Sequence, residues 1–274
     1  MTKEIVNHAI KALLYEVVTE PKPGLVDPSN NGSHSDMDAF TFISSSLALE
    51  DYFIEAAKLG EQFQEADLTV LFQNLRKAGI LAERQMFRAT QGVNTHKGAI
   101  FALGIFVCAK SYADKNNLNV FSVIKQMCAG LVERDLKQVQ HYTTVGATIY
   151  KQYGIAGARE MAESGYQVVE QIALPFLIRA TGTTNQRLLD TLMKIAAEIP
   201  DTTFIKRSGG IDQLSWLKQA MQRYFELGGS KSPEGMQYLH ELNDIFVAHN
   251  YTIGGCADIL IVTVFMALEM EKLV

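Results

Sequence analysis

The chain has 274 residues, 47% of them hydrophobic and 20% charged, so it is long enough to bury a sizeable core and has an ordinary globular composition. Its net charge of −5, its pI near 5.7 and its lack of a dense Lys/Arg block argue against a surface for nucleic acid. The three cysteines are widely spaced and form no CxxC pair, so they indicate neither a disulfide framework nor a zinc site.

Residues 4–18 place apolar side chains at helical spacing and predict a first amphipathic helix. Charged residues are scattered through residues 1–15 and no apolar block follows a charged end, so the pattern is not that of a secretory signal. A cytoplasmic protein is therefore expected.

Residues 20–38 predict one long ordered loop, because three prolines restrict their own φ and push the preceding residues toward extended conformations. The loop contains Asp27, His34, Asp36 and Asp38, and this density of carboxylate and imidazole groups is typical of a phosphate or metal site. The alternative is structural: Asp36 as the N-cap of the next helix, predicted over 37–59. The helix dipole also favours acids at that position without any function.

A helix is predicted over 67–90, and another resumes at 99–110 after an interruption with the sequence QGVNTHKG. Thr95 is the expected N-cap of the second helix. Asn94, His96 and Lys97 then lie at a helix start, where free N–H groups attract anions, which makes them candidates for binding phosphate. A plain helix–turn–helix connection is the alternative, since the glycines match neither a Walker A nor a GxGxxG pattern.

Further helices are predicted over residues 118–133, 143–150, 158–163, 166–177, 185–198, 211–227 and 233–248. Arg159 pairs either with a substrate or with its neighbour Glu160. Between two of these helices, Asp201 is a candidate metal ligand, and Lys206 and Arg207 are candidates for neutralising phosphate, with solvated helix-end charges as the competing interpretation.

The last block, 251–274, predicts a glycine-led apolar helix that is too short in its uninterrupted run to span a bilayer. Asp258 lies in its first turns, where a carboxylate in apolar surroundings needs a partner. No strand-like alternation rises above the helical signal. The sequence thus predicts an all-α single domain, 1–274, of about ten to thirteen helices, with no membrane span.

Four ordered blocks carry a resemblance to a known family: TEPKPGLVDPSNNGSHSDMD, QGVNTHKGAIFALG, AREMAESGY and YTIGGCADIL. Together they resemble the triphosphoribosyl-dephospho-coenzyme A synthases over nearly the whole chain. One departure lies before the paired glycines, where the family commonly has Ser-Pro and this chain has Thr252-Ile253.

The resemblance implies that the 2′-hydroxyl of 3′-dephospho-CoA displaces adenine from C1′ of ATP. The product would be the prosthetic-group precursor for the acyl carrier protein of citrate lyase or malonate decarboxylase. This chemistry requires a proton acceptor, negative charge near an oxocarbenium-like C1′, and cations on the triphosphate.

Within that set, Asp36 and Asp38 are assigned to Mg²⁺ or to the ribose cation, and His34 to proton transfer. The substrate-binding candidates are Lys22, Asp27, Asn94, His96, Lys97, Arg207 and Asp258. A Mg²⁺-dependent nucleotide phosphohydrolase and a non-catalytic nucleotide-binding partner of an acyl carrier protein are the two alternative functions.

Overall fold

The structure, a computed structural model, describes residues 2–137 and 145–273. All regular elements in these two stretches are helical, so the predicted all-α class is confirmed. Eleven of the fourteen α-helices have eight or more residues, which agrees with the expected ten to thirteen. The α-helices are α1 (Thr2–Val18), α2 (Ala39–Ala48), α3 (Glu50–Gln62), α4 (Leu68–Ala89), α5 (Lys97–Asn116), α6 (Val120–Met127), α7 (Val145–Tyr153), α8 (Ala158–Glu163), α9 (Leu174–Arg179), α10 (Thr184–Glu198), α11 (Thr202–Arg207), α12 (Leu214–Glu226), α13 (Pro233–His249) and α14 (Gly254–Glu269).

Local signals account for several helix boundaries. Asp67 caps α4 by accepting a hydrogen bond from the backbone N–H of Thr69, and Thr183 forms a capping box with Gln186 at the start of α10. The single helix predicted over 37–59 is wrong, because the chain breaks at the buried Leu49 into α2 and α3. No glycine or proline marks that break in the sequence. The first two residues of the helix predicted over 143–150 lie outside the described residues, and the remainder begins α7.

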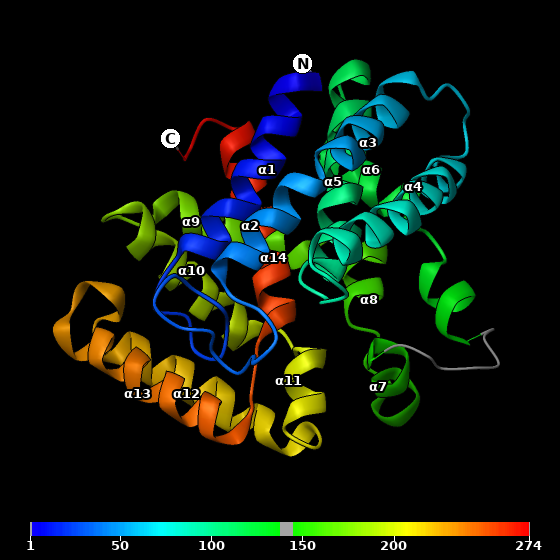
Figure 1. The fold of residues 1–274 in the computed structure, drawn as a ribbon. Coiled ribbons are helices and arrows are strands. Elements are labelled where there is room, and N and C mark those ends of the chain that lie inside the picture. The colour runs from blue at the N-terminus through cyan, green and yellow to red at the C-terminus, as the bar shows by residue number, and fades with distance from the viewer. Residues whose placement is uncertain (1, 138–144, 274) are drawn as a thin grey trace.

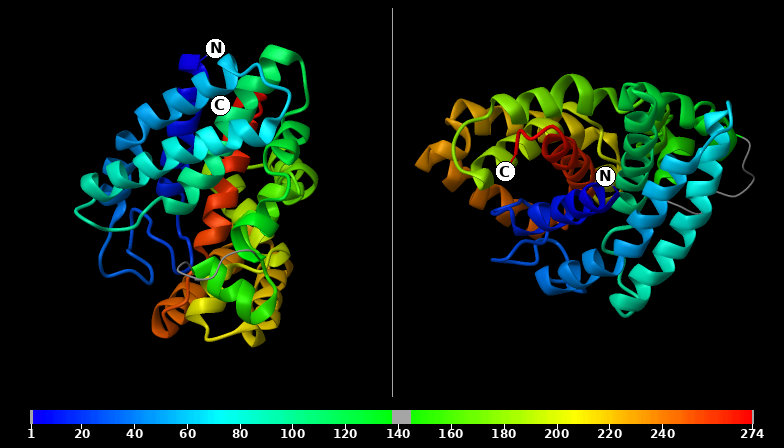
Figure 2. Two further views of the ribbon diagram at one scale, coloured as in Figure 1. Left: turned by 90° about the vertical axis from the view of Figure 1, so that its right-hand side faces the viewer. Right: turned by 90° about the horizontal axis from the view of Figure 1, so that it is seen from above.

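The core is organised around α5 and α14. Residues 259–268 of α14 are all buried, and this helix packs against α1, α5 and α10. Figure 1 shows α14 in the middle of the molecule, and in the view from above in Figure 2 it lies between the α9–α13 group and the α3–α6 group. In the described part of the chain, no helix is both long and apolar enough to cross a membrane.

Several polar loops and helix starts lie together at one end of the bundle. The loop 20–38 lies below α1 and α2 in Figure 1, on the same side of the molecule as α11 and the first turns of α14. Since α5 and α14 both point their N-terminal ends into this region, free backbone N–H groups and the positive ends of two helix dipoles gather there.

Candidate active site

Two pockets, of about 370 and 340 Å³, adjoin at this end of the bundle. The first, which we call the cationic pocket, is lined by His34, Lys206 and Arg207 among others. The second, which we call the apolar pocket, is lined by side chains such as Phe101, Met161 and Ile259. The two pockets share one wall, made by Asn94, Lys97, Gly98, Val145, Thr203 and Asp258. Residues from all four sequence blocks therefore meet around one composite cavity.

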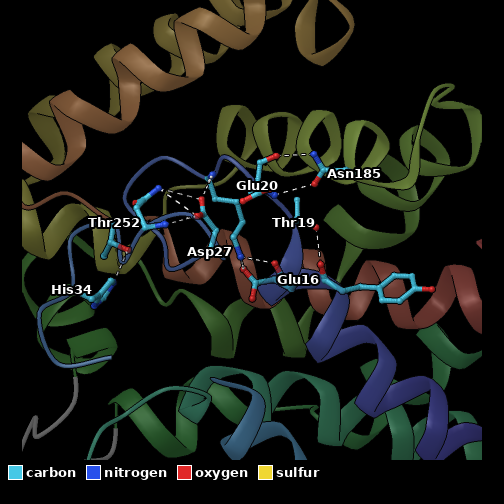
Figure 3. Close-up of polar contacts among 10 residues, drawn as sticks. Glu16, Thr19, Glu20, Asp27, His34, Asn185 and Thr252 are labelled. Carbon is cyan, nitrogen blue, oxygen red and sulfur yellow. Dashed lines mark hydrogen bonds and ion pairs between the residues drawn. The ribbon is translucent and has the colours of Figure 1, made fainter. Parts of the chain in front are cut away.

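The first half of the loop 20–38 is fixed by internal polar contacts, drawn in Figure 3. The Lys22 ammonium is fully buried and donates to the backbone oxygen and the carboxylate of Glu16, both at 2.5 Å. Asp27 is also buried and accepts from the backbone N–H groups of Lys22, Ser29 and Asn30 at 2.8–3.0 Å. Neither Lys22 nor Asp27 lines a pocket. The structure thus places both predicted ligands in the loop framework, because their polar atoms are already satisfied there.

The same loop is attached to three other segments. Asn185 of α10 exchanges two hydrogen bonds with the Glu20 backbone, at 2.9 and 2.7 Å (Figure 3). Arg207 donates to the backbone oxygen of Ser33 at 3.1 Å and also bonds to Asn250. Gly24 has φ +69° and lies so close to the end of α13 that a Cβ would approach the Tyr251 oxygen to 2.5 Å. A glycine is needed there on both grounds.

His34 and Asp36, from the second half of the loop, both line the cationic pocket. The His34 ring nitrogen Nε2 is 3.4 Å from the hydroxyl of Thr252, which lies just before α14 (Figure 3). Burial, followed by the positive charge of Arg207, lowers the pKa of His34 against a smaller opposing effect of Asp36. The imidazole is therefore neutral near pH 7 and able to accept a proton.

Asp38 differs from Asp36 although only one residue separates them. Its carboxylate accepts from the backbone N–H of Thr41 at 2.8 Å and from the Thr41 hydroxyl at 2.7 Å, so Asp38 is the N-cap of α2 in a capping box. These hydrogen bonds lower the pKa of Asp38. Asp38 lines neither pocket, whereas the exposed Asp36 lines the cationic one. The N-cap role proposed for Asp36 as the structural alternative therefore belongs to Asp38.

The two aspartates do not fit a paired Mg²⁺ site in this arrangement. The Asp38 carboxylate is engaged by the helix end, and no group of three or more His, Cys, Asp or Glu side chains among the described residues is placed to hold a metal. Mg²⁺ bound to a nucleotide commonly needs only one or two carboxylates in addition to the phosphates. Of the two aspartates, Asp36 is the one that lines the cationic pocket.

The start of α5 is built differently from the predicted threonine cap. His96 occupies the N-cap position and Thr95 does not cap, because the Thr95 hydroxyl donates instead to the Ser45 hydroxyl of α2 at 2.7 Å. Ser45 Oγ lies 2.8 Å from Nδ1 of the buried His96 ring. Burial lowers the pKa of His96 to about 3, with a smaller effect of the Lys22 charge, so this ring is neutral.

The second ring nitrogen of His96, Nε2, differs from Nδ1. Nδ1 is occupied by Ser45, and either neutral tautomer of the ring fits that contact. Nε2 is buried and has no hydrogen-bond partner among the described residues, while His96 lines the cationic pocket. Nε2 is therefore available to a ligand, as a donor or as an acceptor according to the tautomer.

Asn94 and Lys97 are exposed on the wall between the pockets. The Asn94 side-chain oxygen accepts from the Lys97 backbone N–H at 3.3 Å, and the Lys97 ammonium forms an ion pair with Glu83 at 2.8 Å. A half-exposed ion pair of this kind is weak and can be exchanged for a phosphate at little cost.

Asp258 also belongs to the shared wall. It is partly buried, makes no hydrogen bond to another described residue, and faces the start of α5 so closely that a Cβ on Gly98 would lie 1.9 Å from its Oδ2. Burial, then Asp201 and Glu16, raise the pKa of the Asp258 carboxyl well above its usual range.

Asp201, which lines the apolar pocket, is the buried N-cap of α11. Its Oδ1 accepts from the backbone N–H groups of Thr203 and Phe204, at 2.7 and 3.0 Å, and its Oδ2 accepts from the N–H of Cys256 at 2.8 Å. This carboxylate therefore joins α11 to the first turn of α14. A metal role, which the sequence left open, would compete with these three hydrogen bonds.

The apolar pocket is bounded by the third sequence block. Tyr166 is buried, has φ +53°, and its hydroxyl has no partner among the described residues. Arg159 lines the same pocket, but it pairs with Asp135 at 3.3 Å, and not with the adjacent Glu160.

Similarity to known proteins identifies the family of the chain. The family model described as ATP:dephospho-CoA triphosphoribosyl transferase matches residues 2–274. The chain belongs to this family.

Similar proteins agree with that assignment. The chain is 48% identical to a probable 2-(5''-triphosphoribosyl)-3'-dephosphocoenzyme-A synthase of Lactiplantibacillus plantarum, with 99% of each chain covered. It is 38% identical to a protein of the same description from Citrobacter koseri, covering 94% of this chain and 88% of the relative. It is also 48% identical to the protein CitXG of Leuconostoc mesenteroides, of which the matched region is 58%. No solved structure matches the chain.

The predicted family, the predicted transferase activity and the predicted substrates ATP and dephospho-CoA are therefore confirmed, and the two alternative functions are not favoured. Sequence reasoning missed two residues that line the cavity, Glu16 and Tyr166, and it also missed Ser45, which contacts the His96 ring. Only Tyr166 carried a signal, because it ends the third sequence block. Glu16 and Ser45 lie within ordinary helical patterns, and their importance depends on Lys22 and His96, which come from other segments.

Proposed function

We propose that this transferase joins the triphosphoribosyl group of ATP to the 2′-hydroxyl of 3′-dephospho-CoA, with ATP lying across both pockets. The triphosphate would occupy the cationic pocket, near Lys97, Lys206 and Arg207, and adenine would occupy the apolar pocket. The bond between C1′ and the base would then cross the shared wall.

The observation that carries this assignment is the contrast between two adjoining pockets. Lys206 and Arg207 of α11 line the first pocket and not the second. Apolar side chains such as Phe101, Met161 and Ile259 line the second, together with the charged Arg159 and Asp201. A nucleoside triphosphate has the same division between an anionic and a flat apolar end. Phosphates favour helix starts and basic side chains, and a base favours an apolar slot with few polar groups.

The second substrate would approach from the open side of the cationic pocket. His34, neutral near pH 7, is the group we assign to take the proton of its 2′-hydroxyl. Thr252 holds the ring from behind at 3.4 Å. His96 would donate its Nε2 proton to a phosphate or ribose oxygen, which would satisfy the one polar atom of that ring left without a partner.

Mg²⁺ would arrive with ATP. Asp36 would complete the coordination of the ion together with the phosphates. Asp38 would contribute only by capping the N-terminus of α2. The ion supplies charge neutralisation on the triphosphate when bound.

Product analysis tests the proposed reaction. The purified protein is mixed with ATP and Mg²⁺, with and without dephospho-CoA, and the products are separated by chromatography. We expect free adenine only in the complete mixture, because the acceptor hydroxyl and not water is the nucleophile. ADP or phosphate as the main product would contradict the proposal.

We further propose that the product is the prosthetic-group precursor for the acyl carrier protein of citrate lyase or malonate decarboxylase, as the sequence resemblance implies. The test is to offer the purified product to each apo-carrier protein together with its own holo-carrier-forming transferase. A mass increase on one carrier identifies the system served.

A further inference from the structure

Asp258 combines features that a structural carboxylate does not need. It lies on the wall shared by both pockets, and it makes no hydrogen bond to another described residue. Gly98 leaves room for the carboxylate at the start of α5. The carboxyl group is partly buried, faces both pockets and has no partner among the described residues, so it is available to bond a group of the bound substrate.

The groups around Asp258 favour its protonated form. Asp201 faces it from the α11 cap, Glu16 from α1, and the thiol of Cys256 and the hydroxyl of Tyr166 lie within electrostatic range. The one nearby cation on the shared wall, Lys97, is paired with Glu83. Burial and the two acids together raise the pKa of Asp258 well above its usual range, which favours the protonated form that a general acid needs.

The proposed reaction has a need for such a proton donor. Adenine is a poor leaving group as an anion, and protonation of a ring nitrogen lets it depart as a neutral base. With ATP across the two pockets, the departing base lies in the apolar pocket on the Asp258 side, away from His34.

We propose that Asp258 is the general acid that protonates the adenine leaving C1′ of ATP. The inference rests on the proposed function. The C1′–N9 bond breaks with its electron pair going to adenine, the bond between C1′ and the acceptor oxygen forms, and the Asp258 proton moves to a ring nitrogen such as N7. The acceptor hydroxyl loses its own proton to His34, which releases it to solvent, and Asp258 takes up a proton from solvent again.

The test compares nucleotides that differ in their need for protonation. In 7-methyl-ATP the base already carries the positive charge that the acid would create, whereas 7-deaza-ATP lacks N7 and cannot be protonated there. Asp258→Asn should lose about 10²-fold or more in kcat on ATP, the usual scale for a general acid, but less than about tenfold on 7-methyl-ATP. The wild-type enzyme should bind 7-deaza-ATP and turn it over at least about 10²-fold more slowly than ATP.

Asp36→Asn is the matched control, since it removes a carboxylate from the cationic pocket and should lose activity equally on ATP and 7-methyl-ATP. Equal losses for Asp258→Asn on both nucleotides, with unchanged melting and ATP binding, would overturn the proposal. Adenine release by the wild-type enzyme is measured in the same assay, so failure of the general-acid role is distinguishable from failure of the proposed function.

Discussion

The Asp201 carboxylate provides a quantitative test of how α11 and α14 are held at the site. Asp201→Asn keeps the size of the side chain but replaces one oxygen by an NH₂ group. With the amide in either orientation, that group faces backbone N–H donors: Cys256 on one side, or Thr203 and Phe204 on the other. At least one buried N–H group loses its acceptor.

The expected cost follows from those contacts. Leaving one buried donor unsatisfied costs about 2 kcal/mol, within the usual 1–3. For a domain of this size, that cost lowers the melting temperature by roughly 4–8 °C. The variant should also change the pH profile. Asp201 is the second-largest cause of the raised pKa of Asp258, so its neutralisation lowers that pKa, and activity that needs protonated Asp258 is lost at a lower pH.

Thermal melting and kcat measured against pH are the two assays. Asp67→Asn is the matched control, because Asp67 caps α4 with the same contacts to a threonine two residues later, at 2.9 and 2.8 Å, but is exposed and far from both pockets. Asparagine is an equally good N-cap there, so the control should stay within about 0.5 kcal/mol of wild type. If Asp201→Asn melts like Asp67→Asn and its alkaline limb does not move, the reasoning is refuted.

Three further experiments separate structural from functional roles. In steady-state kinetics, Asp36→Asn should reduce turnover by about 10²-fold or more, near 2.7 kcal/mol. Asp38→Asn keeps the α2 cap and should stay close to wild type. The reverse ranking would mean that Asp38, and not Asp36, is the functional carboxylate. Lys97→Ala should weaken ATP binding about tenfold in calorimetric titration, because it removes the positive charge that faces the phosphate. Glu83→Gln, which removes only the ion-pair partner of Lys97, should not weaken binding. Unchanged ATP affinity of Lys97→Ala would mean that Lys97 does not contact the nucleotide. Tyr166→Phe removes a buried hydroxyl without a partner, so the protein should melt no lower than wild type, yet KM for ATP should rise by roughly fivefold if adenine satisfies that hydroxyl. A KM equal to that of wild type would place adenine elsewhere.

The sequence predicted the helical class and most helices because apolar periodicity is a local property. α4 and α10 match their predicted ranges closely, and both begin at residues with a capping side chain. The break at Leu49 was not predictable in the same way. It has no glycine or proline, and the apolar pattern continues through it from α2 into α3.

The candidate site was predicted by segment more accurately than by residue. Loop composition indicated that residues 20–38 carry a site, but it could not show that Lys22 reaches back to Glu16 while Asp36 faces the cavity. Asp36 and Asp38 have the same chemistry and nearly the same position. Their roles separate only because Thr41 lies three residues after Asp38, which makes Asp38 the residue that closes a capping box.

The position of Asp258 depends on a contact that no local pattern contains. Gly98 and Asp258 lie in separate sequence blocks, and each has an ordinary explanation alone: a small residue in a first helical turn, and an acid near a helix start. In the fold the missing side chain of Gly98 is the space that the Asp258 carboxylate fills. The helices that carry the two residues, α5 and α14, are also the main buried helices of the core. The geometry of the shared wall is therefore set by core packing between α5 and α14, so a core substitution that shifts either helix displaces Asp258 relative to Lys97 even when no pocket residue is changed.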